Sequence, residues 1–338
     1  MNATTTPLER AAPPQAPRPR YGQAHRLVDT RDLDRSAWLA VRRGGLGSSD
    51  AAAAVGLNPY RSALELWLEK TGRDTDDPPE AEDDPRYWGR LLEPMVAEAY
   101  AERTGQRVRR VNAILQHPAH AWMLADLDRE VLGQAGAPIL EIKTAGAYGA
   151  RRWRDGVPED VQLQVQHQLA VTGQPAADVA VLLAGQHLEI HRIERDEALI
   201  ERLIELERGF WSFVEADTPP PADGSDSAER ALRQLYPQDH GAVCDFTDDA
   251  ALARVFAELQ QVRGELAEAQ EQEAALKQHL QQAMGEATEA IFPTGRVRWK
   301  RAKASRRLDT KALQADYPEL AARYQREVSG SRRFTVHD

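Results

Sequence analysis

The chain has 338 residues, 42% of them hydrophobic and 28% charged, a composition that excludes wholesale disorder and predicts about two folded units. The single cysteine, Cys244, excludes a disulfide framework and a cysteine-rich metal site within the chain, and no apolar run is long enough to span a membrane. No secretory signal is visible, so we expect a cytoplasmic protein without a membrane partner. The formal net charge of −10 argues against nucleic acid as a partner, but the charge is unevenly distributed along the chain.

The first two thirds of the chain alternate between helical and strand patterns. Residues 1–23, rich in proline and arginine, predict a disordered leader, and residues 24–217 predict one folded domain. The order of its elements predicts the α/β (α+β) class, with a mixed central sheet flanked by helices. Helices are predicted over 64–71, 90–104, 161–172 and 197–215, and strands over 107–116, 122–132, 139–143, 177–183 and 187–193.

The last third has a different character. Residues 218–228 are rich in proline, glycine and serine and predict a linker. Within an acidic region over 229–290, apolar residues recur from Leu252 to Ala283 at alternating spacings of three and four, broken only at Glu273, which predicts a coiled-coil-like helix. The basic tail over 291–338 predicts β and α elements that either contact nucleic acid or pair with the acidic helix.

Three residues near the predicted third strand carry the strongest chemical signal. Glu141 and Lys143 are two residues apart, so a strand places them on one face, and Asp128 comes near Glu141 if residues 122–132 pair with 139–143 as a hairpin. Two neighbouring carboxylates suit Mg²⁺, and an adjacent ammonium can offset the charge on a reacting phosphate. Glu-x-Lys is also common on exposed strands, so this pattern alone decides little.

Four further residues extend this signal. Glu93 begins a predicted helix, where it is either a third carboxylate at the metal or a residue favoured by the helix dipole. Gln164 lies on a later helix, where it either faces the site or belongs to a solvated face. A glycine-rich turn leads into Ser49, and Arg42 lies seven residues before it; a helix N-terminus with an arginine predicts an anion site.

Taken in order, these segments resemble the YqaJ-like viral recombinase family, which includes phage lambda exonuclease and belongs to the PD-(D/E)xK nuclease superfamily. The resemblance covers about residues 38–219, and the ordered set is far more specific than any single motif. It rests on Arg42 with Ser49 and Asp50, Gly89-Arg90 with Glu93, Asp126 with Asp128, Glu141-Ile142-Lys143, and the segment Gln164–Thr172.

The resemblance implies a catalytic centre with a bound metal ion. Asp128 and Glu141 would be Mg²⁺ ligands, with Mn²⁺ expected to substitute, and Lys143 would be the catalytic lysine. Glu93 would be the acidic residue of the first core helix and a further ligand. Gln164 would be the helix glutamine beside the site. The implied fold is the nuclease core of the superfamily, a mixed sheet between helices.

The resemblance also implies a site for the DNA end. Arg42 and Ser49 match the pair that grips the 5′ phosphate. One departure concerns the metal: where the lambda enzyme has serine two residues before its aspartate, this chain has Asp126. Because Asp126 and Asp128 share a strand face, either of them can be the main ligand.

The expected function is therefore a Mg²⁺-dependent 5′→3′ exonuclease that acts on double-stranded DNA ends in phage-type recombination. The expected partners are a single-strand annealing protein and further copies of the chain, in a ring-shaped trimer like that of the lambda relative, within the cytoplasm of a bacterial host. Two alternatives remain open at this point. The same core can serve a structure- or sequence-specific endonuclease, and the chain can be a DNA-end-binding scaffold without turnover.

Overall fold

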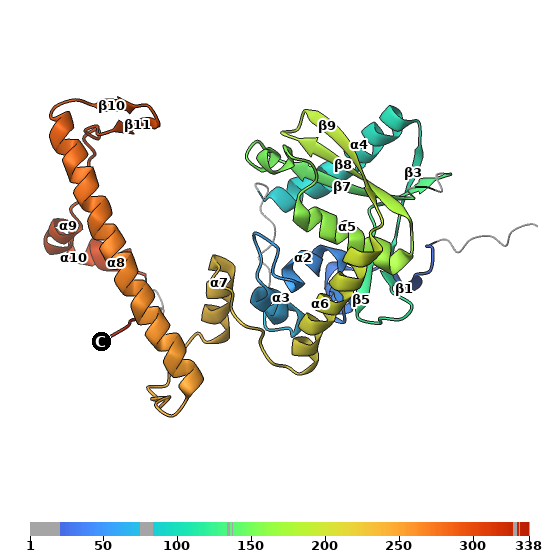
Figure 1. Cartoon of the computed structure of the whole chain (residues 1–338), viewed down its shortest axis with the longest axis horizontal. Helices are drawn as coiled ribbons and strands as arrows, with labels where there is room; N and C mark the ends of the chain where they lie inside the picture. Colours follow the sequence, from blue (N-terminus) through green and yellow to red (C-terminus); the bar gives the residue numbers. More distant parts are fainter. Residues whose placement is uncertain are drawn as a thin grey trace, which may run out of the picture. The chain divides into compact units, whose positions relative to one another are not determined.

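The computed structural model describes residues 21–74, 84–133, 136, 138–326, 330 and 332–337. Contacts between residues divide the chain into two compact units, 1–237 and 238–338 (Figure 1). The last three residues of the predicted leader, 21–23, lie against the first unit, since the backbone N–H of Gln23 donates to the carbonyl of Thr172 at 2.8 Å. The rest of that leader, residues 1–20, lies outside the described residues. No described helix combines the length and the apolar character that crossing a membrane requires.

The centre of the first unit is a five-stranded mixed sheet. Its strand order is β3-β6-β7-β8-β9, and all neighbours are antiparallel except β7 and β8, which are parallel. A parallel pair needs a long crossover, and here the crossover contains a helix. The strands are β3 (Arg107–Arg110), β6 (Arg129–Leu132), β7 (Ile139–Ala145), β8 (Ala176–Leu183) and β9 (His187–Glu194).

Helices cover both faces of this sheet. The helix α4 (Pro85–Thr104) packs on β7 and β8 from one side, and α5 (Glu159–Thr172), with α6 (Glu197–Glu215) against it, lies on the other side (Figure 1). The helix α4 starts one turn earlier than predicted, because Asp84 caps it and Pro85 occupies its first position. This mixed sheet between helices confirms the predicted fold class.

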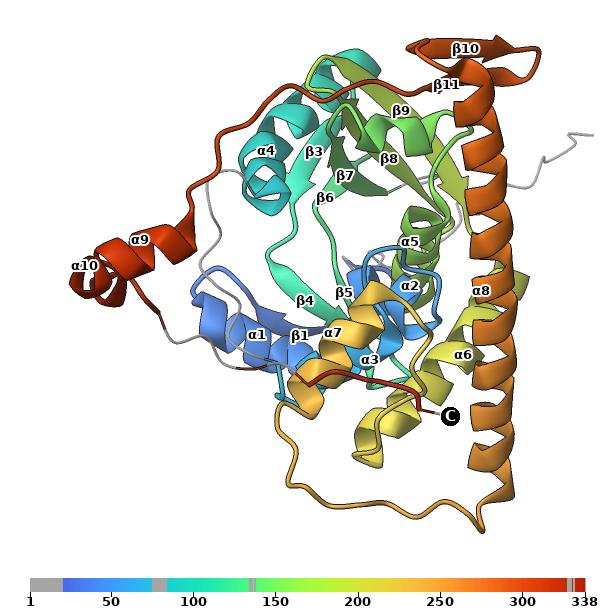
Figure 2. The same ribbon diagram turned by 90° about the vertical axis from the view of Figure 1, so that its left-hand side faces the viewer.

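A second sheet lies beside the first. Its strand order is β1-β4-β5-β2, with β2 parallel to β5 and the other neighbours antiparallel. The chain passes from one sheet to the other between β3 and β4 and again between β5 and β6 (Figure 2). The strands are β1 (His25–Asp29), β2 (Leu46–Gly47), β4 (Ala113–Gln116) and β5 (Met123–Asp126).

The two crossings correct the sequence analysis. The predictions of one strand over 107–116 and one over 122–132 are wrong, because each segment breaks into two strands that belong to different sheets. Val111 and Leu127 are buried at the two breaks, where they belong to the main hydrophobic core. Apolar residues continue across both breaks, so the pattern did not reveal them. Asp128 lies directly at the second break.

Shorter helices complete the first unit. The helix α7 begins inside the predicted linker over 218–228 and packs against α3, so the first unit extends to Pro237. Ser227 near the start of α7 accepts a hydrogen bond from the backbone N–H of Ser62 at 2.8 Å. These helices are α1 (Arg35–Arg43), α2 (Ala51–Ala54), α3 (Ala63–Lys70) and α7 (Asp226–Leu235), with 3₁₀ turns at Ser48–Asp50 (η1) and Gly149–Trp153 (η2).

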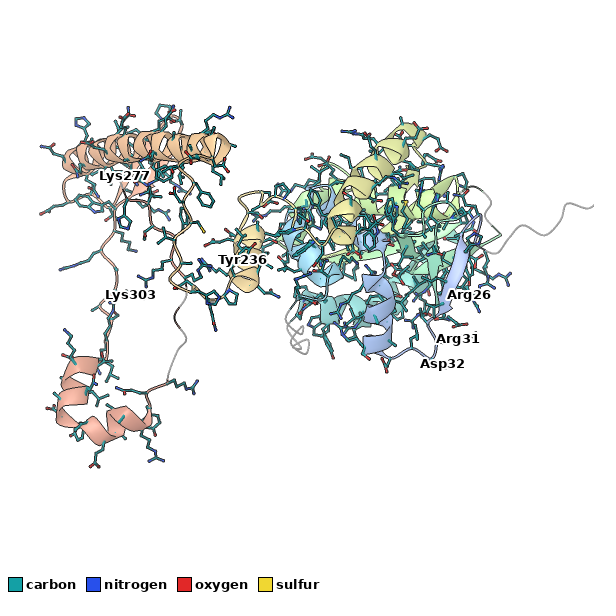
Figure 3. The ribbon with its side chains drawn as sticks, turned by 90° about the horizontal axis from the view of Figure 1, so that it is seen from below. Arg26, Arg31, Asp32, Tyr236, Lys277 and Lys303 are labelled. Carbon is teal, nitrogen blue, oxygen red and sulfur yellow. The ribbon has the colours of Figure 1, made fainter. Side chains whose placement is uncertain are left out.

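The second unit is built around one long helix. Its main element is α8, a helix of 35 residues with no buried residue, followed by a two-stranded hairpin. Side chains project from α8 around its whole circumference, and Lys303 lies on the extended stretch that follows the hairpin (Figure 3). The elements are α8 (Ala250–Met284), β10 (Glu289–Phe292), β11 (Gly295–Arg298), α9 (Thr310–Asp316) and α10 (Pro318–Arg323).

Candidate active site

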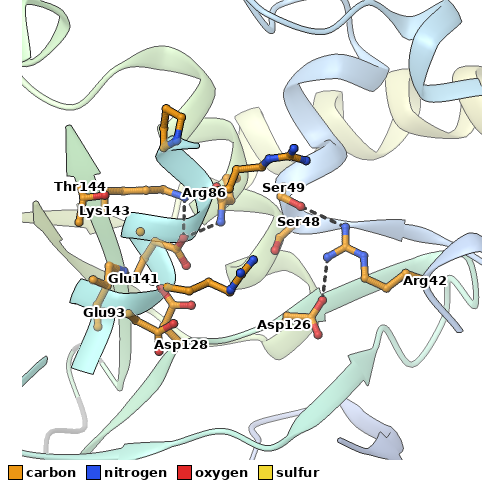
Figure 4. A pocket seen from close by; sticks show the side chains of 15 residues that line it. Arg42, Ser48, Ser49, Arg86, Glu93, Asp126, Asp128, Glu141, Lys143 and Thr144 are labelled. Atoms are coloured by element: carbon orange, nitrogen blue, oxygen red, sulfur yellow. Dashed lines mark hydrogen bonds and ion pairs between the residues drawn. The ribbon is translucent and has the colours of Figure 1, made fainter. Parts of the chain in front are cut away.

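All eight predicted site residues line one open pocket of the first unit. The pocket has a volume of about 490 Å³. Two groups of side chains line opposite sides of it, one around the carboxylates and one around an arginine (Figure 4). The predicted residues in its lining are Arg42, Ser49, Glu93, Asp126, Asp128, Glu141, Lys143 and Gln164.

The carboxylate side of the pocket is built on β7 and the break before β6. Glu141 and Lys143 face the pocket, while Ile142 between them is buried against the α4 side of the sheet. The Ile142 backbone N–H donates to Asp128 Oδ2 at 2.8 Å, so the aspartate is tied to the strand that carries Glu141. The expected meeting of Asp128 with Glu141 is therefore present.

Two glutamines on α5 hold the buried carboxylate of Glu141. Gln164 Nε2 donates to Glu141 Oε1 at 2.6 Å, and Gln168 Nε2 donates to Oε2 at 2.7 Å. Lys143 Nζ lies 2.8 Å from both Glu141 Oε1 and Gln164 Oε1. Gln168 shares a helix face with Gln164, four residues earlier, but was not among the predicted site residues.

The electrostatics follow from crowding and burial. Burial raises the pKa of Asp128 to about 8, and the neighbouring carboxylate of Glu141 adds to this rise. Burial lowers the pKa of Lys143, but Glu141 and Asp128 outweigh it, so the net pKa lies above its usual value. Lys143 is therefore a cation at neutral pH, held beside two carboxyl groups.

The donor set fits a hard cation that keeps some of its water. Asp128 and Glu141 supply carboxylate oxygens at one place, and a divalent ion would remove the repulsion between them. Glu93 also faces the pocket, but its carboxylate accepts a hydrogen bond from Arg129. In the part of the chain that the structure describes, no three Asp, Glu, His or Cys side chains are arranged as they stand to hold an ion.

The opposite side of the pocket centres on Arg42, which is only 8% exposed. Its Nη1 donates to Asp126 Oδ2 at 2.9 Å, and its Nη2 donates to Ser49 Oγ and to Asp50 Oδ2, each at 3.0 Å. A Cβ atom at Gly47 would lie 2.3 Å from Arg42 Nη2, so the guanidinium occupies space that any other residue would fill. Arg42 and Ser49 thus meet as predicted, with Asp126 beside them.

A buried charge network fixes this arginine. Asp50 is 3% exposed and accepts hydrogen bonds from Lys70 Nζ at 2.7 Å and from the Gly47 backbone N–H at 3.0 Å, besides that from Arg42. Burial raises the pKa of Asp50, but Lys70, Arg42 and Arg61 outweigh it and hold the pKa well below its usual range. Lys70 lies at the end of α3, and no sequence signal connected it to the site.

The first turns of α4 add two basic residues that the sequence analysis did not assign. Arg86 and Arg90 lie four residues apart on α4, and Glu93 follows on the same face of the helix. A second pocket of about 520 Å³ shares Arg90, Glu93 and the two aspartates with the first and adds Trp38 to its lining. Glu93, Asp126 and Asp128 therefore border both hollows, whereas Glu141 lines only the first.

This arrangement brings together the parts that phosphodiester hydrolysis requires. One side presents carboxylates and an ammonium, and the other presents a guanidinium and a hydroxyl. Basic residues of α4 line the space between them (Figure 4). A phosphate chain can thus be bound at one point and face the carboxylates at another.

Comparison with known proteins places the chain in a family. Residues 37–175 match the family model of the YqaJ-like viral recombinase domain. A relative from Bacillus subtilis (strain 168), the uncharacterized protein YqaJ, is 34% identical over 321 residues, which cover 94% of this chain and 98% of the relative. The chain belongs to the YqaJ-like viral recombinase family. Because 321 aligned residues exceed the 237 of the first unit, the likeness to the Bacillus protein continues into the second unit.

Two solved structures are also similar to this YqaJ-like chain. One is an alkaline exonuclease (LHK-Exo) from Laribacter hongkongensis, at 24% identity and a TM-score of 0.45, covering 59% of this chain and 97% of that one. The other is a phage-related exonuclease from Haemophilus somnus 129PT, at 12% identity and a TM-score of 0.40, covering 51% and 94%.

Proposed function

We propose that this YqaJ-like chain is a Mg²⁺-dependent exonuclease that degrades double-stranded DNA in the 5′→3′ direction in a phage-type recombination system. The observation that carries the proposal is the single pocket in which Asp128, Glu141 and Lys143 face Arg42 and Ser49. Membership of the YqaJ-like viral recombinase family supports it.

In this proposal Asp128 and Glu141 would hold the metal ion, and Glu93, which accepts a hydrogen bond from Arg129, would be a further ligand. The ion supplies Lewis-acid activation of the phosphate and of an attacking water. Lys143 holds its positive charge beside the reacting phosphate and offsets the negative charge that develops there. Gln164 keeps Lys143 and Glu141 in place, since it is hydrogen-bonded to both.

The contacts of Asp126 favour Asp128 as the main ligand. Asp126 Oδ2 is bound to Arg42, on the side of the pocket away from Glu141, whereas Asp128 is tied to β7 next to Glu141 (Figure 4). Asp128→Asn should therefore abolish cleavage, and Asp126→Asn should retain it. Equal loss in both variants would show that the two aspartates share the metal.

The same geometry supplies the proposed polarity. If the 5′ phosphate of a DNA end binds at Arg42 and Ser49, the next phosphodiester bond reaches the carboxylates on the other side of the pocket. Hydrolysis then releases a nucleotide and leaves a new 5′ phosphate, which can occupy the same place. The product is a 3′ single strand, for which a single-strand annealing protein in the bacterial cytoplasm is the proposed recipient.

The decisive experiment is digestion of a linear duplex with 5′-phosphate or 5′-hydroxyl ends, with and without Mg²⁺. We expect Mg²⁺-dependent release of mononucleotides, faster from phosphorylated ends. A closed circular plasmid, which offers no end, should stay intact. Cutting of the plasmid would support an endonuclease instead, and normal degradation by Asp128→Ala/Glu141→Ala would assign the activity to a contaminant and favour a scaffold.

A further inference from the structure

The helix α8 exposes an apolar stripe to solvent in the structure. None of its 35 residues is buried, and several of its large apolar side chains are more than half exposed, among them Val255 at 60%, Leu266 at 56% and Leu276 at 61%. Leu259 and Leu280 are partly covered. A helix of this length gains most of its stability in proteins from packing one face against a partner. The other described elements of the second unit leave most of that face exposed.

The stripe has the heptad spacing of a coiled-coil seam. With Leu252 at position a, the seam runs through five a positions and five d positions. Leucine occupies every a position except 273, and valine, leucine and alanine occupy d. The a residues are Leu252, Leu259, Leu266, Glu273 and Leu280, and the d residues are Val255, Val262, Ala269, Leu276 and Ala283.

The charges beside the seam fit a second copy of the same helix in parallel. In a parallel pair, each g residue meets the e residue that begins the partner's next heptad. Glu258 at g then meets Arg263 at e of the copy, and Gln272 meets Lys277. No pair of like charges arises. In an antiparallel pair of the same length, Glu258 and Arg263 would both meet uncharged or weakly charged residues.

Glu273 is the one charged residue at a seam position. It forms an ion pair with Lys277 one turn later on the same helix, at 2.7 Å. In a parallel pair, the two Lys277 side chains would flank the two Glu273 carboxylates and offset their repulsion. Such a polar a residue lowers stability but fixes the register of the strands.

We propose that α8 is a self-association surface, on which a second copy of this chain binds in parallel register through the a and d residues. This inference is independent of the exonuclease activity. It concerns a part of the chain that lies outside the catalytic unit. The likeness to the Bacillus relative continues into that part.

The test is disulfide cross-linking of the full chain, in a Cys244→Ser background that removes the single exposed cysteine. Val255→Cys places a thiol at a d position near the start of α8, where a parallel copy presents the same thiol within bonding distance. In an antiparallel pair these two positions would be about 36 Å apart, given a rise of about 1.5 Å per residue. Ala257→Cys, on the opposite side of the helix, is the matched control.

We expect mild oxidation to give at least about tenfold more covalent dimer from Val255→Cys than from Ala257→Cys. Adding Leu259→Glu and Leu266→Glu should remove the difference, while circular dichroism confirms that the first unit stays folded. Equal cross-linking of both cysteine variants, or none in either, would overturn the proposal. Cross-linking between a Val255→Cys chain and a Leu280→Cys chain, whose positions an antiparallel pair brings together, would show an antiparallel pair and overturn the parallel register.

Discussion

Two helices of this molecule, α5 and α8, differ in how much of their surface is buried. Ten of the 14 residues of α5 are buried, and its polar side chains have partners on β5, β7 and α6. None of the 35 residues of α8 is buried. The groups of the proposed chemistry are thus held by buried contacts inside the first unit, whereas the apolar stripe of α8 is exposed.

The two units also differ in whether their charged side chains are buried or exposed. In the first unit, buried Arg42, Asp50 and Lys70 are bound to one another. In the second unit, the charges of α8 and of the hairpin are exposed, and Arg296 and Arg298 share Glu289. Changes in the first unit should therefore have large effects on catalysis, and changes in the second should act on binding and assembly.

Lys143→Ala tests the first half of this comparison and should have the largest effect. Loss of the ammonium should lower kcat by about 10³-fold, because the charge acts on the transition state, while DNA binding stays within a few-fold. Single-turnover cleavage and a separate binding assay measure the two. Lys277→Ala on α8 is the control and should leave kcat unchanged. Equal loss of binding and cleavage would show that Lys143 is misassigned.

Arg42→Ala should have the next largest effect, confined to one kind of DNA end. Charge-assisted hydrogen bonds contribute about 1.5–3 kcal/mol, so the rate on 5′-phosphorylated ends should fall about 10- to 100-fold, with little change on 5′-hydroxyl ends. Arg43→Ala is the matched control, because Arg43 follows Arg42 in the chain but donates to Asp74. If both kinds of end lose rate equally, Arg42 has a structural role through Asp50 and Asp126.

A chain that ends at Pro237 tests what the second unit contributes to DNA binding. All the predicted site residues lie in the first unit, so this shorter chain should cleave DNA at low salt. We expect weaker binding and a flatter slope of log K against log salt, by about 0.9 for each phosphate that the basic tail neutralises in the full chain. The full chain with Leu259→Glu and Leu266→Glu controls for loss of assembly. An unchanged slope would mean that the tail does not bind DNA.

The smallest expected effect concerns the buried pair of His167 and Glu207, which are 2.7 Å apart and join α5 to α6. Burial lowers the pKa of His167, but Glu207 outweighs it, so the folded-state pKa lies above its usual value. The resulting stability is fully present below about pH 6.5 and is lost as the pH rises through the folded pKa.

Urea unfolding of the wild type and of His167→Gln measures this effect. The difference in unfolding free energy should shrink by about 1 kcal/mol between about pH 6 and about pH 9. Glu207→Gln removes the carboxylate that raises the pKa of His167. The unfolding free energy of this variant should therefore vary less with pH, as in His167→Gln. A difference that grows with pH would contradict the raised pKa.

The sequence predicted more of the site than of the strand order. Spacing alone placed Glu141 and Lys143 on one face, because strand geometry fixes it locally. It failed where two segments change sheets at Val111 and Leu127, since alternation reports burial and not which neighbour provides it. Lys70 and Arg86 were missed for separate reasons. Lys70 meets Asp50 only through tertiary packing, and Arg86 lies in the first turn of α4, which the apolar pattern did not include.

The close approach of Gly47 to Arg42 has an evolutionary consequence. Because a Cβ at 47 would lie 2.3 Å from Arg42 Nη2, an alanine there would push the guanidinium away from Ser49 and Asp126. The two positions should then change together among related chains. Lineages that keep arginine at 42 should keep glycine at 47, and those without the arginine should tolerate larger residues there. Glycine at 47 should thus indicate, in a related sequence, that the arginine at 42 occupies the same position.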